Sequence, residues 1–155
     1  MNSDVTIRRM ILADVESVFQ IQESLGFEHW PLSEFEEELL RPYIFAFSLE
    51  VVENGEKKIA GYAVFSLAAD EVELLAIAVV RTWQHRGMAQ KLFDFGITVL
   101  LRVGAKKVFL EVRRGNTPAI SLYQKLGFLQ IGVRKKYYDD KEDALLMSLS
   151  LGTGA

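Results

Sequence analysis

The stretch VELLAIAVVRTWQHRGMAQKL, Val72–Leu92, decides how the sequence is interpreted. It begins with a nearly continuous apolar run, which is typical of a strand buried on both faces. A short polar loop follows, and apolar residues at helical spacing start near Met88. Gly87 permits a tight turn just before that helix, and a helix N-terminus favours an anion such as phosphate. The stretch predicts a strand, an anion-wrapping loop and a helix, with an ordinary strand-to-helix turn as the alternative.

The composition is that of an ordinary globular domain. The chain has 155 residues, of which 50% are hydrophobic and 25% are charged, and its formal net charge is -3. This charge gives no reason to expect nucleic-acid or membrane binding. The chain has no cysteine, so a disulfide framework and a thiolate nucleophile are excluded. No signal peptide and no apolar run of ~20 residues is found, so we expect a cytoplasmic protein.

The N-terminal third predicts one strand and two helices. Residues 5–11 alternate like a short strand, and apolar residues recur at helical spacing from Asp14, with Gly26 able to end that helix. A carboxylate at Asp14 suits the first turn of a helix. Ser33 and Glu36 have the spacing of a capping box, which predicts a short helix to about residue 40.

The middle of the chain predicts strands around one long helix. Residues 43–68 contain two β runs joined at Asn54-Gly55, a pair that tolerates the positive φ angles of a tight hairpin. After the strand and loop of the opening stretch, helical spacing continues to about Val103. Residues 106–112, KKVFLEV, predict another strand.

The C-terminal third predicts one helix and two strands. Asn116 or Thr117 can cap a helix with Pro118 at its first position, and Gly127 can close it. Residues 129–151 contain two strands joined by a polar turn. The predicted order is therefore β-α-α-β-β-β-α-β-α-β-β, an α+β fold with helices on both faces of a mixed sheet. No repeat or linker divides residues 1–155, so we expect a single domain.

Several stretches carry a resemblance to a known family. AVVRTWQHRGMAQKL (residues 78–92) resembles the Q/R-x-x-G-x-G/A pyrophosphate loop of the GNAT superfamily of acyl-CoA N-acyltransferases. VFLEVRRGNTPAISLYQKLGF and VRKKYYDDKEDALLMSL resemble the bacterial RimI-type ribosomal-protein alanine N-acetyltransferases, as does FEHWPLSEFEEELL. The chain has Val80 and Arg81 where that branch usually has an acidic residue and proline, and Ala89 where it has a second glycine. None of these differences changes what the backbone of the loop can bind.

The resemblance implies the GNAT fold and roles for particular residues. Acetyl-CoA would be the cosubstrate, Glu111 the general base and Tyr123 the general acid. Asn116 would form a hydrogen bond with the cofactor. The residues implied to hold the pantetheine arm are Ile77, Ala78 and Val79, and those implied to hold the pyrophosphate are Gln84, His85, Arg86, Gly87, Met88, Ala89 and Gln90.

The residues themselves leave alternatives for both catalytic assignments. Glu111 lies within the apolar run VFLEV, which is unusual for a carboxylate, but an ion pair with Arg113 or Arg114 would also explain it. Tyr123 follows Ile120 by about one helical turn and can instead be a core aromatic residue. An unperturbed α-amine with a pKa near ~8 is neutral in roughly one molecule in ten at pH 7, whereas a lysine near ~10.4 rarely is. One modest base therefore suits an α-amine better.

On the acceptor side, the resemblance implies that Arg134, Tyr137 and Tyr138 contact the substrate N-terminus. A solvated turn with two tyrosines is the alternative. Four carboxylates of residues 34–40 can attract a basic peptide or can simply form the wet face of a short helix. They are Glu34, Glu36, Glu37 and Glu38. His29 and His85 have no partner at metal-ligand spacing, so we expect no metal.

Together these observations predict an acetyl-CoA-dependent Nα-acetyltransferase. Its acceptor is expected to be a protein N-terminus, and the resemblance implies the N-terminal alanine of a small-subunit ribosomal protein. The amine would attack the thioester directly in a ternary complex, because the chain has no cysteine to form an acyl-enzyme. Acetylation of a small amine or an internal lysine is one alternative, and a CoA-binding module without turnover is another.

Overall fold

The computed structural model describes residues 4–25, 31–138 and 141–152. Its elements are β1 (Val5–Arg9), the 3-10 turn η2 (Leu12–Asp14), α1 (Val15–Ser24), α2 (Leu32–Leu39), β2 (Ile44–Glu53), β3 (Glu56–Ala68), β4 (Glu71–Val79), the 3-10 turn η3 (Arg81–Trp83), α3 (Met88–Arg102), β5 (Lys107–Arg113), α4 (Thr117–Lys125), β6 (Leu129–Arg134) and β7 (Ala144–Ser150). The predicted order of helices and strands is confirmed, and two 3-10 turns are added to it.

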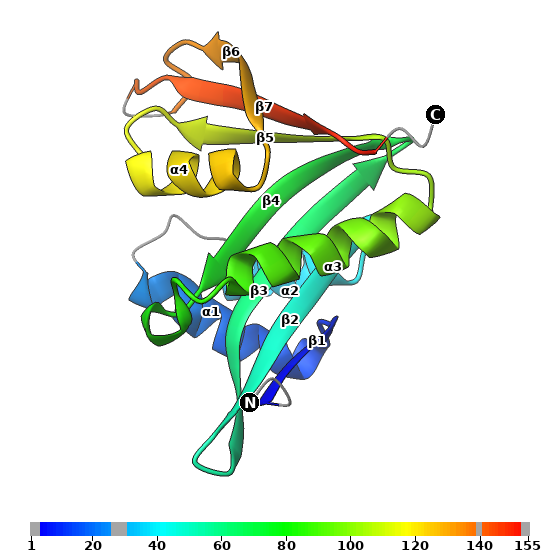
Figure 1. Cartoon of the computed structure of the whole chain (residues 1–155), viewed down its shortest axis with the longest axis vertical. Coiled ribbons are helices and arrows are strands. Elements are labelled where there is room, and N and C mark those ends of the chain that lie inside the picture. Colours follow the sequence, from blue (N-terminus) through cyan, green and yellow to red (C-terminus); the bar gives the residue numbers. More distant parts are fainter. Residues whose placement is uncertain (1–3, 26–30, 139–140, 153–155) are drawn as a thin grey trace.

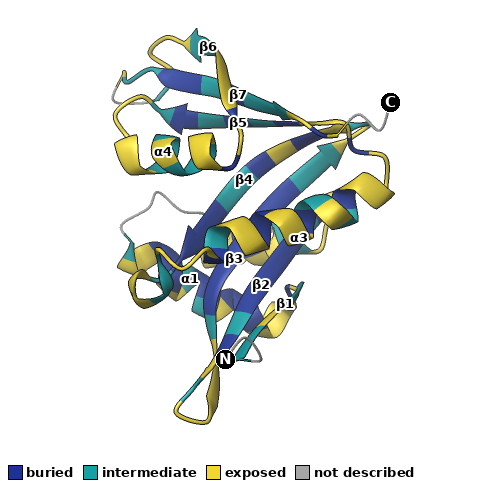
Figure 2. Cartoon of the chain, viewed as in Figure 1, coloured by how far each residue is buried: buried dark blue, intermediate teal, exposed yellow. Residues whose placement is uncertain are grey.

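The strands form one seven-stranded sheet in the order β1-β2-β3-β4-β5-β7-β6. Every neighbouring pair is antiparallel except β4 and β5, which are parallel. Helices cover both faces, as predicted: α1 and α2 lie on one face and α3 on the other (Figure 1). Burial is concentrated in β2, β3 and β4, between these layers (Figure 2).

α3 lies very close to the sheet because it has a glycine in the contact. A Cβ on Gly96 would collide with the ring of Phe65 on β3, and it would also lie 3.3 Å from the ring of Phe47 on β2. Both rings are fully buried. The small residue at position 96 therefore fixes how closely α3 packs on the sheet, and α3 in turn carries the predicted anion-binding loop at its start.

The predicted hairpin and the predicted start of α4 are confirmed. Asn54 and Gly55 have φ angles of 52° and 78°, as a tight turn between β2 and β3 requires. Asn116 is the N-cap of α4, and its side chain accepts a hydrogen bond of 3.3 Å from the N–H of Ala119. Pro118 is the second residue of α4 rather than the first, because the helix begins at Thr117.

The capping box predicted at Ser33 is wrong. α2 begins at Leu32, the residue before Ser33, and its N-cap is Pro31. The carbonyl of Pro31 accepts the first helical hydrogen bond, 3.0 Å long, from the N–H of Phe35. Pro31 has an extended backbone that leads directly into the helix, so Ser33 is already inside the first turn. Gly26, predicted to end α1, lies outside the described residues.

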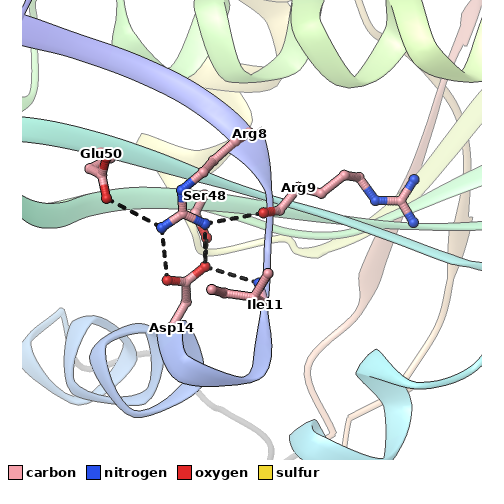
Figure 3. A network of polar contacts seen from close by, with 6 residues as sticks. All are labelled: Arg8, Arg9, Ile11, Asp14, Ser48 and Glu50. Atoms are coloured by element: carbon pink, nitrogen blue, oxygen red, sulfur yellow. Dashed lines mark hydrogen bonds and ion pairs between the residues drawn. The ribbon is translucent and has the colours of Figure 1, made fainter.

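A partly buried ion pair between Arg8 and Asp14 connects β1 to the start of α1 (Figure 3). Asp14 accepts hydrogen bonds from both terminal nitrogens of Arg8, at 2.7 and 3.0 Å, and from the N–H of Ile11 and the hydroxyl of Ser48. Burial alone would raise the pKa of Asp14, but the hydrogen bonds from Arg8, Ile11 and Ser48 outweigh it and hold the pKa below its usual range. Asp14 is thus a structural residue rather than only a favourable charge at a helix start.

The sheet parts between β4 and β5. Their parallel ladder contains only the pairs from Glu71↔Lys107 to Glu73↔Phe109, after which the two strands diverge (Figure 1). On its other side β4 stays paired with β3, but the register shifts between Val64 and Phe65, so that Leu75 is an extra residue in β4. The second half of β4 therefore has a partner on one side only.

Candidate functional site

The parted half of β4 offers backbone groups on the side that β5 has left. The N–H of Val80 donates to the carbonyl of Ala60 at 2.8 Å. Hydrogen-bonded pairs alternate along an antiparallel ladder, so Ala78 forms the next such pair with Tyr62. The peptide groups of Ile77 and Val79 consequently point away from β3. Three residues were predicted to pair with the pantetheine arm. The backbone groups of Ala78 face β3, so Ile77 and Val79 remain the candidates for that pairing.

The loop after β4 is held by its own side chains. The side-chain amide of Gln84 donates to the carbonyl of Val79 at 2.8 Å, and that of Gln90 donates to Asp94 at 2.8 Å. Each of these two amides therefore has one of its two N–H donors engaged within the protein. The guanidinium of Arg86 lies over the ring of Trp83, 4.6 Å from its centre.

The backbone of the loop turns sharply into α3. Both His85 and Gly87 have positive φ angles, 62° and 79°. The N–H of Lys91 makes the first helical hydrogen bond, to the carbonyl of Gly87 at 3.1 Å. The N–H groups of the three preceding residues, Met88, Ala89 and Gln90, come before that bond. A helix start reached through a left-handed glycine suits an anion such as a phosphate group.

Glu111 lies in β5, and its partner is not one of the arginines expected from the sequence. Its carboxylate is 3.4 Å from the guanidinium of Arg134 on β6, and 25% of the Glu111 side chain is exposed. Arg113 and Arg114 instead form ion pairs with acidic residues just before β7, at 3.1 and 3.6 Å. The local alternative for Glu111 is therefore wrong, because the strands place Arg113 and Arg114 beside other carboxylates.

Tyr123 projects from α4 into the larger core cluster. Its ring packs edge-on against Phe128 with 6.0 Å between ring centres. Burial raises the pKa of Tyr123, and the nearby phenol of Tyr138 raises it further. Burial likewise raises the pKa of Tyr62, with Tyr123 as the second cause. Because Tyr62 lies opposite Ala78, this interaction places Tyr123 near the parted half of β4.

The predicted acceptor-side residues form a stacked group. Arg134 lies over the ring of Tyr137, at 4.7 Å, and Arg113 lies over the ring of Tyr138, at 4.0 Å. The two tyrosine rings meet edge to face at 5.1 Å. The segment after β6 is therefore an exposed turn whose two tyrosines are held by cation–π contacts.

A hollow of about 580 Å³ lies beneath α2. Three of the four carboxylates considered in the sequence line it, and Glu36 does not. Glu38 also pairs with Arg41 at 3.0 Å. The lining residues are Glu34, Glu37, Glu38, Tyr43, Ile44, Ser66 and Leu75. The side of the sheet next to the parted strands is therefore acidic.

Glu73 is a carboxylate near the parted strands that the sequence analysis did not single out. It lies at the last rung of the β4–β5 ladder, opposite Phe109. The signal was available, because Glu73 interrupts an apolar run just as Glu111 does. The sequence alone did not reveal that the two runs would be neighbouring strands with both carboxylates on one face.

The remaining predictions concern metals and membranes. His29 lies outside the described residues. Among the residues that the structure does describe, no group of three or more His, Cys, Asp or Glu side chains could hold a metal ion. Within the same residues, no helix has the length and apolar character needed to cross a membrane.

The chain is similar to known acetyltransferases in sequence and in structure. The model of the Acetyltransferase (GNAT) family matches residues 13–128. The chain is 30% identical to the ribosomal protein bS18-alanine N-acetyltransferase of Escherichia coli, over 94% of this chain and 97% of that protein. It is 32% identical to an N-alpha-acetyltransferase of Saccharolobus solfataricus, over 96% and 94% of the two chains. The crystal structure of the Escherichia coli ribosomal-protein-S18-alanine N-acetyltransferase superposes with a TM-score of 0.80 at 30% identity, covering 97% of this chain and 98% of that one.

Proposed function

Since this chain belongs to the acetyltransferase (GNAT) family, we propose that it transfers an acetyl group from acetyl-CoA to the α-amino group of a protein N-terminus. The acceptor we favour is the N-terminal alanine of a ribosomal protein, the substrate class named for the Escherichia coli relative. A ribosomal acceptor would place the enzyme in the cytoplasm. The observation that carries the proposal is the parting of β4 from β5 after Glu73, at a strand that leads directly into the start of α3.

The donor side fits an extended cosubstrate that ends in phosphates. Ile77 presents its N–H and its carbonyl along the edge of β4 that β5 has left, and Val79 presents its N–H, because the carbonyl of Val79 already accepts from Gln84. An extended pantetheine arm can join these groups as a further strand would. The N–H groups of Met88, Ala89 and Gln90 lie at the far end of that edge and suit a diphosphate. Asn116 uses its side-chain oxygen to cap α4, which leaves its NH₂ group as the part that would contact the cosubstrate.

Acetyl-CoA, when bound, supplies an activated acetyl thioester. Glu111 would take a proton from the amine, directly or through a water molecule, because an amine must be neutral to act as a nucleophile. Tyr123 would give its proton to the departing thiolate, and its raised pKa keeps that proton in place at neutral pH. The outward N–H of Ile77 or Val79 would stabilise negative charge that develops on the carbonyl oxygen.

The acceptor side is suited to a cationic peptide. The acidic hollow beneath α2 shares Ser66 and Leu75 with the strands next to the parting. Arg134 and the tyrosines after β6 line the opposite border of the same sheet region. An N-terminal ammonium group followed by basic residues would be attracted to the carboxylates under α2.

The test is acetylation of defined acceptors, followed by mass spectrometry. The protein is incubated with acetyl-CoA and a peptide that begins with alanine and carries basic residues after it. Matched acceptors are the same peptide with a blocked N-terminus and an internal lysine, and a small polyamine. We expect a gain of one acetyl group on the free N-terminus only.

The other outcomes identify the alternatives. Faster modification of the blocked peptide would point to internal lysine, and faster modification of the polyamine would point to a small amine. Acetyl-CoA binding by calorimetry without modification of any acceptor would favour a non-catalytic module. Each of these results would overturn the proposed function.

A further inference from the structure

Glu142 lies just before β7, and its carboxylate reaches the turn that joins β5 to α4. One carboxylate oxygen accepts a hydrogen bond of 2.8 Å from the N–H of Gly115, and the other accepts one of 3.1 Å from the guanidinium of Arg113. The backbone also closes this turn, because the N–H of Asn116 donates to the carbonyl of Arg113 at 3.0 Å. Glu142 therefore holds the turn from a segment that is 27 residues away from Gly115 in the sequence.

Gly115 leaves room for this carboxylate. A Cβ at position 115 would lie 2.5 Å from one carboxylate oxygen of Glu142, which is closer than Cβ atoms come to their neighbours. Gly115 does not have a positive φ angle, so the turn itself does not require glycine at this position. The small residue at position 115 therefore serves the contact with Glu142.

Arg113 extends the contact to the acceptor side. Its guanidinium lies over the ring of Tyr138, 4.0 Å from the ring centre, and also donates to Glu142. The backbone makes a second link, because the N–H of Tyr138 donates to the carbonyl of Glu142 at 3.2 Å. In this cluster the carboxylate holds the guanidinium, and the guanidinium holds the tyrosine ring.

The neighbouring carboxylate, Asp143, makes a separate set of contacts. It accepts a hydrogen bond of 3.0 Å from the N–H of Lys136 and lies 3.6 Å from the guanidinium of Arg114. None of these contacts involves Gly115 or Tyr138. Asp143 therefore offers a comparison within the same turn, whereas Glu142 contacts the groups that border both proposed substrate sites.

The two segments that Glu142 joins serve different substrates in the proposed reaction. Asn116, next to Gly115, is expected to contact acetyl-CoA, and Tyr138 is expected to contact the acceptor. We propose that Glu142 is a positioning residue for both substrates. It fixes Asn116 through the N–H of Gly115, and it fixes Tyr138 through the guanidinium of Arg113. This inference rests on the proposed acetyl transfer, because that reaction assigns the two sides.

Two substitutions at position 142 separate the two contacts. Glu142→Gln keeps a carbonyl oxygen that can accept from the N–H of Gly115. Its other terminal group is an NH₂, which cannot accept a hydrogen bond from the guanidinium of Arg113. Glu142→Ala removes both contacts. A residue that only stabilised the fold would not affect the two substrates separately.

The first test uses the unliganded protein and needs no acceptor. Proton NMR follows the N–H of Gly115, which moves upfield when it loses its acceptor, and the side-chain protons of Arg113, which the ring current of Tyr138 shifts upfield. In Glu142→Gln the Arg113 protons should move downfield, and the Gly115 N–H should move less than in Glu142→Ala. Signals like those of the parent in both variants would overturn the proposal.

The second test measures each substrate by itself. The Kd for acetyl-CoA, from calorimetry, should stay within about twofold of the parent in Glu142→Gln and rise about fivefold in Glu142→Ala, which loses the hydrogen bond to the turn. The KM for the acceptor amine should rise about 10-fold in both variants, with kcat within about twofold, because both lose the charged contact to Arg113.

Two further variants serve as control and as safeguard. Glu50 is likewise a glutamate paired with an arginine, and its side chain is 20% exposed against 33% for Glu142, but it lies on β2 beside Arg8. Glu50→Gln should leave both constants within about twofold of the parent. Gly115→Ala pushes the Glu142 carboxylate off the turn, so it should raise the Kd for acetyl-CoA even if Glu142→Ala does not fold. Melting temperatures measured by circular dichroism show which variants are folded.

The outcomes separate this inference from the proposed function. If the parent acetylates a polyamine or an internal lysine instead of a peptide N-terminus, the proposed function fails, and the NMR and acetyl-CoA measurements still test Glu142. A KM for the preferred amine that is unchanged in Glu142→Gln would overturn the proposal, as would an unchanged acetyl-CoA Kd in both Glu142→Ala and Gly115→Ala. A raised KM with an unchanged Kd in Glu142→Gln supports it.

Discussion

Two arginine–carboxylate pairs, one near each edge of the sheet, are built in different ways. Arg8 on the edge strand β1 holds Asp14, whose side chain is only 6% exposed and accepts four hydrogen bonds of 2.7–3.0 Å. Arg134 on the edge strand β6 holds Glu111, whose side chain is 25% exposed, through one contact of 3.4 Å. A carboxylate whose two oxygens both accept hydrogen bonds from the protein stabilises the fold. A carboxylate held by one loose contact can exchange that contact for a substrate.

The two ion pairs also differ in how tightly the strands around them are paired. The Asp14 network lies where β1, β2 and α1 are packed together (Figure 3). Glu111 lies next to the parallel junction between β4 and β5, where the ladder ends after Glu73. Strands that part leave backbone and side chains accessible, whereas continuous antiparallel pairing buries them. The difference between the two pairs therefore follows from the topology around them.

Glu111→Gln is expected to have the largest effect on activity. Loss of the proton acceptor should lower kcat by about 10²- to 10³-fold, because that is the usual contribution of a general base. The Kd for acetyl-CoA and the melting temperature should change little. Steady-state kinetics from pH 6 to 9 would check this, and turnover of Glu111→Gln equal to that of the parent over that range would contradict the role of Glu111.

Asp14→Ala is expected to have the largest effect on stability. Removal of a buried partner from a hydrogen-bonded ion pair should lower the free energy of unfolding by about 3 kcal/mol, measured by urea denaturation at pH 7. Turnover per folded molecule should remain that of the parent. If Asp14→Ala lost activity without losing stability, the distinction between the two pairs would be wrong.

The same variant has a predicted pH dependence. The pKa of Asp14 is lowered in the folded protein, so its contribution to stability is present above the unfolded value near ~4 and is lost as the pH falls through the folded value. The stability difference between the parent and Asp14→Ala should therefore shrink as the pH falls below about 4. A difference that stays constant down to pH 2 would argue against a charged Asp14 in the folded state.

Tyr123→Phe is expected to lower kcat about 10²-fold, the lower end of the usual contribution of a general acid. Acetyl-CoA binding should be retained, because the ring still packs on Phe128. Burial raises the pKa of Tyr123 above that of an ordinary tyrosine, so its phenol keeps its proton as the pH rises from 8 to 10. The parent should therefore not lose turnover through this group over that pH range. Equal turnover of the variant and the parent would show that another group protonates the thiolate.

The smallest effect is expected from Arg134→Gln, which is best measured beside its counterpart Arg8→Gln. Arg134→Gln should cost less than about 1 kcal/mol of stability, because more than half of its side chain is exposed. Arg8→Gln leaves the buried Asp14 without its cation and should cost about 2–3 kcal/mol. Urea denaturation of both variants side by side makes the comparison, and equal losses would refute the distinction drawn between the pairs.

Turns and helix caps were predicted correctly where they depend on a few residues that are adjacent in the sequence. The hairpin at Asn54-Gly55 and the cap at Asn116 each follow from a few residues in sequence, and both are confirmed. The capping box at Ser33 failed because Pro31 supplied an earlier start that competes for the same turn. The partner of Glu111 was not predictable, because Arg134 is 23 residues away in sequence and reaches it through β7.

The sequence by itself determined the order of helices and strands, the tight turn at Gly87 before α3, and the candidates Glu111 and Tyr123. Each of these depends on propensities and spacings that act over a few residues. Only the tertiary structure decided that β4 leaves β5 after Glu73, that Ile77 and Val79 rather than Ala78 face the opening, and that Glu73 and Glu111 share a face. These features depend on strand register between segments far apart in the chain, and no local pattern encodes that register.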